Sequence, residues 1–150
     1  MDYLPKTQAG SSLTLAAQEI FDEDGFIMPI LEIEVVVTED ESLGHELAPS
    51  LAEAAGGIFG SPAGGTWVRL RELPLSQYAE NGGGPIDGVL PVFVTVLKAR
   101  LPTPGDLESE IEKLTNEIAR LCRRPPENVH LIYQPEGAGR VAFGGRLVTG

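Results

Sequence analysis

Four basic residues near predicted strands are the side chains of this sequence best suited to binding a small anion. Lys98 and Arg100 follow one β-branched stretch and are two positions apart, so they share a face if the strand continues through both. Arg69 and Arg71 alternate in the same way within the segment TWVRLREL. Together they indicate an anion site. Exposed strand-end cations and surface ion pairs are the structural alternatives, and both interpretations stay open at this point.

The composition excludes several other functions. The net charge is −11, and residues 1–53 hold twelve of the 22 acidic residues but one of the eleven bases, so the chain lacks the basic patch of a nucleic-acid-binding protein. We expect a cytoplasmic protein with no membrane partner, because no apolar stretch is long enough to span a bilayer and no apolar signal segment follows Asp2. Cys122 is alone, and His45 and His130 lack a metal-ligand spacing, so we expect no metal and no organic cofactor.

The elements that position these residues form two similar segments. The strand-like stretch MPILEIEVVV is led by Pro29, and LPVFVTVLKA is led by Pro91, a repeat of about 62 residues. TWVRLREL and NVHLIYQP follow as second strands at the same spacing. Apolar residues three and four positions apart predict an amphipathic helix inside each segment, the first helix being shorter and weaker. These residues are Leu47, Leu51, Ala54, Ala55 and Ile58, and then Leu107, Ile111, Leu114, Ile118 and Leu121.

A crossover helix makes the two strands of each unit parallel. The sequence therefore predicts an α/β (α+β) fold, with a four-stranded mixed sheet, two helices on one face and short hairpins. We expect one domain over 28–150, built from units at about 28–84 and 90–150, after an N-terminal extension over 1–27. Val35, Val36 and Val37 are consecutive, so apolar side chains point to both faces of the sheet. Two helices cover only one face, and we expect other copies of the chain to cover the second.

Two proline-led β-α-β units followed by the hairpin segment AFGG resemble the tautomerase superfamily, which includes 4-oxalocrotonate tautomerase and macrophage migration inhibitory factor (MIF). The resemblance covers about residues 28–150, and its most specific parts are Met28-Pro29, TWVRLRELPLSQYAENGG and NVHLIYQPEGAGRVAFGG. The two-unit length is similar to the MIF branch. The resemblance implies a homotrimer with sheets inside and helices outside. It also implies an active site near each amino-terminal proline, at a subunit boundary.

In such a site Pro29 is the base of a tautomerisation, which removes a proton beside a carbonyl and returns it to another atom. A base works best when its pKa lies near the working pH. A chain-terminal amine has an ordinary pKa of about 7.7–8.0, and an apolar pocket or a nearby cation lowers it further. In related members of the family the same proline serves hydration, dehalogenation or decarboxylation.

This chemistry requires a free nitrogen on Pro29, and Met28 acylates that nitrogen in the full chain. In one interpretation translation starts at Met28, or processing removes residues 1–27, and loss of the methionine exposes Pro29. In the other interpretation the leader is retained and proline chemistry is impossible without cleavage. The segment SSLTLAAQEIF predicts a short helix capped by Ser12, which either covers the site or is upstream sequence read in frame.

The resemblance also assigns roles to the four cations. It implies that Lys98 and Arg100 hold a substrate carboxylate and stabilise the developing enolate. A lysine at this position lacks the planar fork of arginine and gives a looser clamp. Arg69 or Arg71 is expected to reach the pocket of a neighbouring subunit, and a surface salt bridge is the alternative.

Three further residues have weaker assignments. Phe143, in AFGG, corresponds to an apolar wall near the proline, and ordinary packing at a subunit contact fits it equally well. Tyr133 is expected to donate a hydrogen bond to a substrate oxygen, with core packing as the alternative. His130 lies near a position where 4-oxalocrotonate tautomerase carries an arginine, and a structural role is the simpler interpretation.

The sequence therefore predicts a homotrimeric tautomerase or isomerase that acts on a small anionic 2-oxo or enol acid, with Pro29 as catalytic base. The alternative comes from a different class of protein. It is a non-catalytic trimer of the same fold, whose retained leader blocks Pro29 and serves interaction or regulation.

Overall fold

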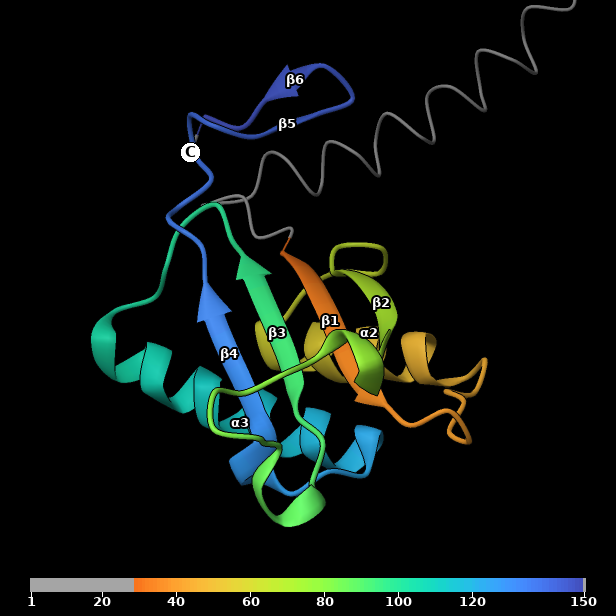
Figure 1. The fold of residues 1–150 in the computed structure, drawn as a ribbon. Helices are drawn as coiled ribbons and strands as arrows, with labels where there is room; N and C mark the ends of the chain where they lie inside the picture. The colour runs from red at the N-terminus through yellow and green to blue at the C-terminus, as the bar shows by residue number, and fades with distance from the viewer. Residues whose placement is uncertain (1–28, 150) are drawn as a thin grey trace, which may run out of the picture.

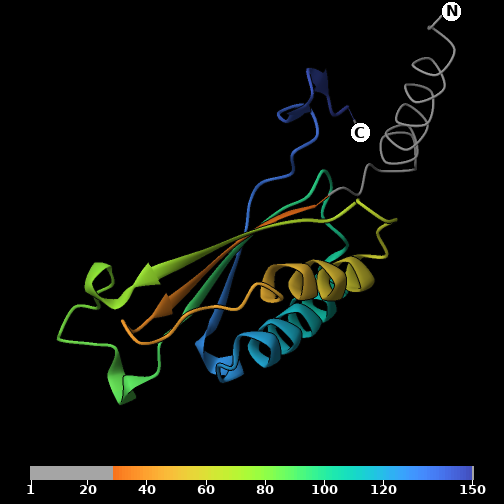
Figure 2. The same ribbon diagram turned by 90° about the vertical axis from the view of Figure 1, so that its right-hand side faces the viewer.

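A four-stranded sheet in the order β2-β1-β3-β4 forms the centre of the structure, a computed structural model that describes residues 29–149. β1 runs parallel to β2 and β3 runs parallel to β4, whereas β1 and β3 are antiparallel. Figures 1 and 2 show both long helices on one face of this sheet. The bounds are Ile30–Val37 for β1, Leu47–Phe59 for α2, Trp67–Pro74 for β2, Val92–Leu97 for β3, Pro104–Cys122 for α3 and Val129–Tyr133 for β4. The predicted fold class is confirmed.

The two halves of the sheet repeat one β-α-β unit, as the sequence predicted. β1 and β3 begin at Ile30 and Val92, and β2 and β4 begin at Trp67 and Val129, so both pairs keep the repeat of about 62 residues. Because β1 and β3 are antiparallel neighbours, the start of β1 lies beside the ends of β3 and β4. The helix expected from Ser12 onward lies outside the described residues.

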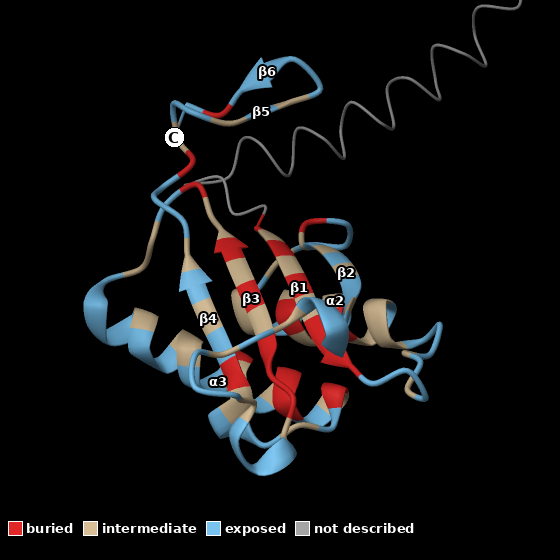
Figure 3. Cartoon of the chain, viewed as in Figure 1, coloured by how far each residue is buried: buried red, intermediate tan, exposed pale blue. Residues whose placement is uncertain are grey.

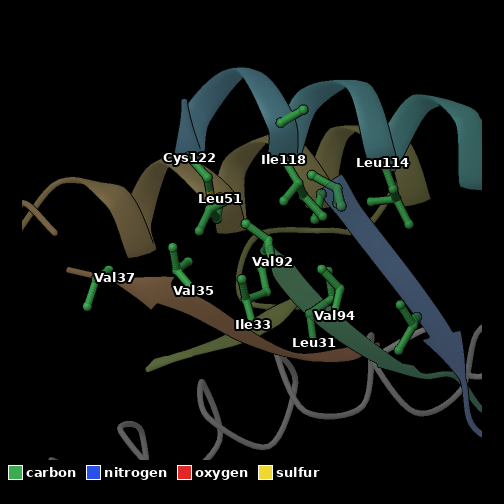
Figure 4. Close-up of a cluster of buried hydrophobic side chains, with 14 residues drawn as sticks. Leu31, Ile33, Val35, Val37, Leu51, Val92, Val94, Leu114, Ile118 and Cys122 are labelled. Atoms are coloured by element: carbon green, nitrogen blue, oxygen red, sulfur yellow. The ribbon is translucent and has the colours of Figure 1, made fainter. Parts of the chain in front are cut away.

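The core lies between the helices and the helix-facing side chains of the two central strands (Figure 4). Alternate residues of β1 and β3 point to this side, because side chains alternate along a strand. Leu51 of α2 and Leu114 of α3 pack against them, and both are almost fully buried. Each such side chain contributes about 1.5–3 kcal/mol by leaving water. The strand residues are Leu31, Ile33 and Val35 in β1 and Val92, Val94 and Val96 in β3. Figure 3 shows the buried residues concentrated in these two strands.

The two long helices end in left-handed residues. Gly60 follows α2 with φ 68°, and the amide of Ser61 donates to the carbonyl of Gly56 at 2.9 Å, as in a Schellman motif. Arg123 follows α3 with φ 57°. Pro104 begins α3, where a missing N–H costs little.

A nearly buried arginine ties the far end of the sheet together. The Arg124 guanidinium donates to the carbonyls of Val36 at 2.8 Å and Leu90 at 3.0 Å, and it forms an ion pair with Glu41 at 2.9 Å. These contacts join the end of β1, the segment before β3 and the loop that follows β1 to the end of α3. The bonds satisfy a charge that would otherwise be costly to bury.

The remaining described elements are short. The 3-10 helices are η1 (Leu75–Gln77), η2 (Ile86–Gly88) and η3 (Pro126–Asn128), and the hairpin strands are β5 (Ala142–Phe143) and β6 (Arg146–Leu147). Figure 1 shows this hairpin beyond the end of the sheet where β1 begins. Gly137 lies at its base and donates from its amide to the carbonyl of Lys98 at 2.8 Å. A Cβ on Gly137 would lie 3.1 Å from the Val141 side chain, so the close approach favours glycine.

The sheet face away from the helices is charged on one half and apolar on the other. Arg69 of β2 lies opposite Glu32 of β1, and their side chains form an ion pair at 2.6 Å. On the other half, Phe93 of β3 packs against the ring of His130 with centroids 5.6 Å apart, and Ile132 of β4 is 58% exposed. Neither long helix lies over this face (Figure 2), and Tyr78, from the segment after β2, packs on Phe93 with ring centroids 5.9 Å apart.

Among the described helices, none is both long and apolar enough to cross a membrane.

Candidate active site

Pro29 lies at the head of β1, and its ring is fully buried. Its carbonyl accepts a hydrogen bond from the amide of Trp67, the first residue of β2, at 3.0 Å. This bond continues the parallel pairing of β1 with β2 and fixes the backbone of the proline. The structure therefore places Pro29 rigidly at one end of the sheet.

Lys98 lies across the sheet from Pro29. Ile30 pairs with Leu97 in the antiparallel register of β1 and β3, so the next positions outward are Pro29 and Lys98. The Lys98 ammonium donates to Glu110 Oε1 of α3 at 2.8 Å and lies 4.8 Å from the centre of the Phe59 ring. Both side chains of the Lys98–Glu110 pair are only 11% exposed. The strand-end cation thus lies on the helix side of the sheet, in contact with residues of both α2 and α3.

Tyr133, the last residue of β4, joins the same cluster. Its hydroxyl donates to Glu110 Oε2 at 2.6 Å, so the two carboxylate oxygens hold one partner each. Burial raises the pKa of Tyr133 well above its ordinary value, and the hydrogen bond to Glu110 raises it further. The hydroxyl keeps its proton at neutral pH and directs it to Glu110. To donate to a substrate oxygen, Tyr133 would have to give up this bond.

Glu110 is a functional candidate that the sequence analysis missed. It lies three residues after Leu107 and four before Leu114, so it falls on the apolar stripe of α3. A charged residue on a core-facing stripe needs a partner, and this pattern was the sequence signal for Glu110. Glu110, Lys98, Tyr133 and Phe59 are called the Glu110 cluster below.

Arg100 does not share a strand face with Lys98. β3 ends at Leu97, and the chain bends at Ala99 and Arg100, so the alternation that would align the two cations stops. Arg100 is exposed near the same end of the sheet. The amide of Leu101, next along the chain, donates to Glu136 at 2.7 Å.

Arg69 and Arg71 lie on the other side of the sheet from the Glu110 cluster. Arg69 is ion-paired to Glu32, and Arg71 faces Glu34 in the register of β2 with β1. Within one chain neither arginine is near Pro29, because β2 turns these side chains away from the helices.

Phe143 connects to Pro29 through one intermediate residue. Its ring packs edge-on against the Trp67 ring, with centroids 5.3 Å apart, and the Trp67 amide donates to the Pro29 carbonyl. The indole of Trp67 donates to the carbonyl of Gly64 at 3.0 Å. The hairpin thus reaches the end of the sheet that holds Pro29. His130 lies on the open face against Phe93, away from this cluster.

Two surface cavities lie elsewhere. One, of about 560 Å³, lies between the loop after β1 and the end of α3, and Cys122 lines it. Burial raises the pKa of the Cys122 thiol to about 11, which makes it a poor nucleophile at neutral pH. The other, of about 700 Å³, lies between the end of α2 and the loop that leads to Thr66. Within residues 29–149 no group of acidic, histidine or cysteine side chains is placed to hold a metal ion.

The architecture of this chain is a mixed sheet of two β-α-β units with two helices on one face. Solved structures of 4-OT and MIF proteins share it. The F6 fused 4-OT wild-type asymmetric trimer matches with a TM-score of 0.63 and 19% identity, over 78% of this chain and 95% of that chain. Pt0534 inactivated by 2-oxo-3-pentynoate matches with a TM-score of 0.63 and 19% identity, over 79% and 95%. MIF from Trichinella spiralis matches with a TM-score of 0.62 and 15% identity, over 79% and 98%.

No protein-family model and no curated protein sequence matches the chain. The likeness is therefore one of fold, at low sequence identity, and the predicted resemblance to the tautomerase superfamily is confirmed at that level.

Proposed function

We propose that the protein is a tautomerase in which Pro29, once it is the first residue of the chain, acts as the catalytic base. The observation that carries this proposal is the position of Pro29, fixed at the head of β1 and opposite Lys98 in the sheet register. The ring nitrogen takes a proton from an enol or from a carbon beside a carbonyl and returns it to the other position. The substrate and product are isomers, so the reaction needs no oxidant and no cofactor.

The surroundings of Pro29 suit this role. A chain-terminal amine starts with a pKa of about 7.7–8.0. Burial disfavours its protonated form and brings the pKa closer to neutrality, where a general base is most effective. The pyrrolidine ring is fully buried, and Lys98 is its neighbour across the sheet.

The proposed substrate is a small anionic 2-oxo or enol acid. Lys98 and Arg100 are the proposed holders of the substrate carboxylate and of the developing enolate, and Lys98 has Glu110 as its partner in the same chain. Phe143 and Trp67 supply the apolar wall on the hairpin side. The inactivation of Pt0534, a protein of the same fold, by 2-oxo-3-pentynoate supports a 2-oxo acid as the ligand class.

We also propose that the chain assembles through the open face of its sheet, as a trimer. The support is the exposed Ile132 on the sheet face that neither long helix covers, together with the trimeric fused 4-OT of the same fold. Arg69 and Arg71, which point to this face, would then lie where a neighbouring copy can use them. Light scattering at micromolar concentration should give the mass of three chains, and a monodisperse monomer would count against this assembly.

The experiment that tests the function compares chains that begin at Met1 and at Met28. Ketonisation of the enols of phenylpyruvate and 2-oxopentanoate, which carry one carboxylate each, is followed by ultraviolet absorbance. We expect turnover from the chain that begins at Met28, after loss of its methionine, and background rates from the chain that begins at Met1. Background rates from both chains would rule out the tautomerase on these substrates. They would favour the second candidate, a non-catalytic protein, which the acylation of Pro29 by Met28 motivates.

A further inference from the structure

The cation nearest to Pro29 is already neutralised by a residue of its own chain. Glu110 accepts from Lys98 at 2.8 Å and from Tyr133 at 2.6 Å, and no buried side-chain oxygen or nitrogen in the described residues lacks a partner. Lys98 and Glu110 are each 11% exposed, so water screens the pair little. The Phe59 ring closes another side of the ammonium. The Glu110 cluster therefore pairs one positive side chain with one negative side chain.

We propose that Glu110 is a specificity-determining residue that restricts this site to 2-oxo acids with a single carboxylate. The inference rests on the proposed function, which seats the substrate beside Pro29 and hence beside Lys98. One carboxylate is attracted by Lys98 and repelled by Glu110, and these two effects largely cancel. Polar contacts and the apolar wall then decide how tightly such a ligand binds. A second carboxylate on the same ligand gains no free cation from the cluster and adds a like charge near Glu110.

The location of the cluster makes this effect large. Charges interact more strongly at a site with little water than at the surface, and Glu110 reaches its position from the buried stripe of α3. Arg100, which lies near the same end of the sheet, is exposed, so solvent weakens its attraction for a second carboxylate. The paired cluster, and not only the two cations, therefore determines how many carboxylates a bound ligand can carry.

The test uses the full chain and two ligands that differ only in the second carboxylate, 2-oxopentanoate and 2-oxoglutarate. Isothermal titration calorimetry gives the Kd of each ligand for the wild type and for Glu110→Gln. The glutamine keeps an oxygen acceptor for Lys98 and Tyr133 but leaves the cluster with one positive charge. We expect the wild type to bind the monocarboxylate more tightly. We expect the variant to shift the ratio of the two Kd values by at least about tenfold toward the dicarboxylate.

A matched control and a second variant keep the test decisive. Glu112 lies on the exposed face of the same helix, and Glu112→Gln should leave the ratio within twofold of the wild type. Lys98→Gln leaves Glu110 unopposed and should shift the ratio further against the dicarboxylate, which provides a reading if Glu110→Gln does not fold. A ratio unchanged in Glu110→Gln, a wild type that prefers 2-oxoglutarate, or no binding by wild type and Glu110→Gln alike would overturn the proposal.

The binding ratio does not depend on whether Pro29 removes a proton. Background turnover together with the expected shift in the ratio would contradict the proposed reaction and support the charge specificity. Turnover together with an unchanged ratio would support the proposed reaction and overturn the charge specificity.

Discussion

Replacing Glu110 by alanine is expected to lower the free energy of unfolding by about 1–3 kcal/mol, the usual cost of leaving a poorly hydrated polar group without its hydrogen-bond partner. In the wild type, Glu110 accepts hydrogen bonds from the Lys98 ammonium at 2.8 Å and from the Tyr133 hydroxyl at 2.6 Å. The alanine would leave both donors in a space that water reaches poorly, because Lys98 is only 11% exposed. Urea denaturation followed by circular dichroism measures the loss.

Two controls separate the lost pairing from a general effect on α3. Glu112→Ala, on the exposed face of the helix, should change the stability by no more than about 0.5 kcal/mol. The double variant Lys98→Met, Glu110→Leu removes both charges and should lose less stability than Glu110→Ala alone. A loss below about 1 kcal/mol in Glu110→Ala would show that Lys98 finds water or another partner. This result would contradict the role given to Glu110 as the partner that Lys98 needs.

A chain that begins at Pro29 is expected to ketonise its substrate about 10²–10⁴-fold faster than the same chain with one alanine in front of Pro29. This range is the usual contribution of a positioned general base. The added alanine turns the ring nitrogen into an amide, which is not a base near neutral pH, while it adds very little bulk. The comparison of kcat/KM for the two proteins isolates the nitrogen from every other effect of residues 1–28.

The chain that begins at Met1 is the natural companion of this pair. If it is as slow as the alanine-extended chain, acylation of Pro29 accounts for the whole difference between the long and short proteins. Equal rates from the alanine-extended chain and the chain that begins at Pro29 would contradict the proline mechanism.

Much of the fold could be predicted from the sequence because its signals are local and occur twice. The spacing of Leu107, Ile111, Leu114 and Ile118 predicts the helix that the structure places over Pro104–Cys122. Each proline-led, β-branched stretch is a strand, and the repeat fixes which elements correspond. The order β2-β1-β3-β4 then follows from parallel pairing inside each unit and contact between the two first strands.

The candidate site was only partly predictable, because its contacts join residues far apart in the chain. Lys98 was predicted to hold a substrate carboxylate, and nothing in the sequence around it indicated that it is paired with Glu110, twelve residues away on α3. The prediction that Lys98 and Arg100 point the same way required the strand to continue, and β3 ends at Leu97. No local pattern indicates where a strand end will meet a helix face.

The second face of the sheet shows the same limit. The consecutive Val35, Val36 and Val37 are all buried, as their pattern indicates. The face away from the helices nevertheless carries charged side chains as well, because Glu32 and Arg69 form an ion pair across its β1–β2 half. That pairing depends on the register of β1 with β2, which the sequence pattern does not specify at the level of single residues.

The central claim is that the working protein carries Pro29 with an unacylated nitrogen. The intact mass of the protein purified from its native host tests it most directly. We expect the mass of residues 29–150, with Pro29 as the first residue. A mass that includes residues 1–28 would contradict the account, because the nitrogen on which the proposed catalysis depends would then be an amide.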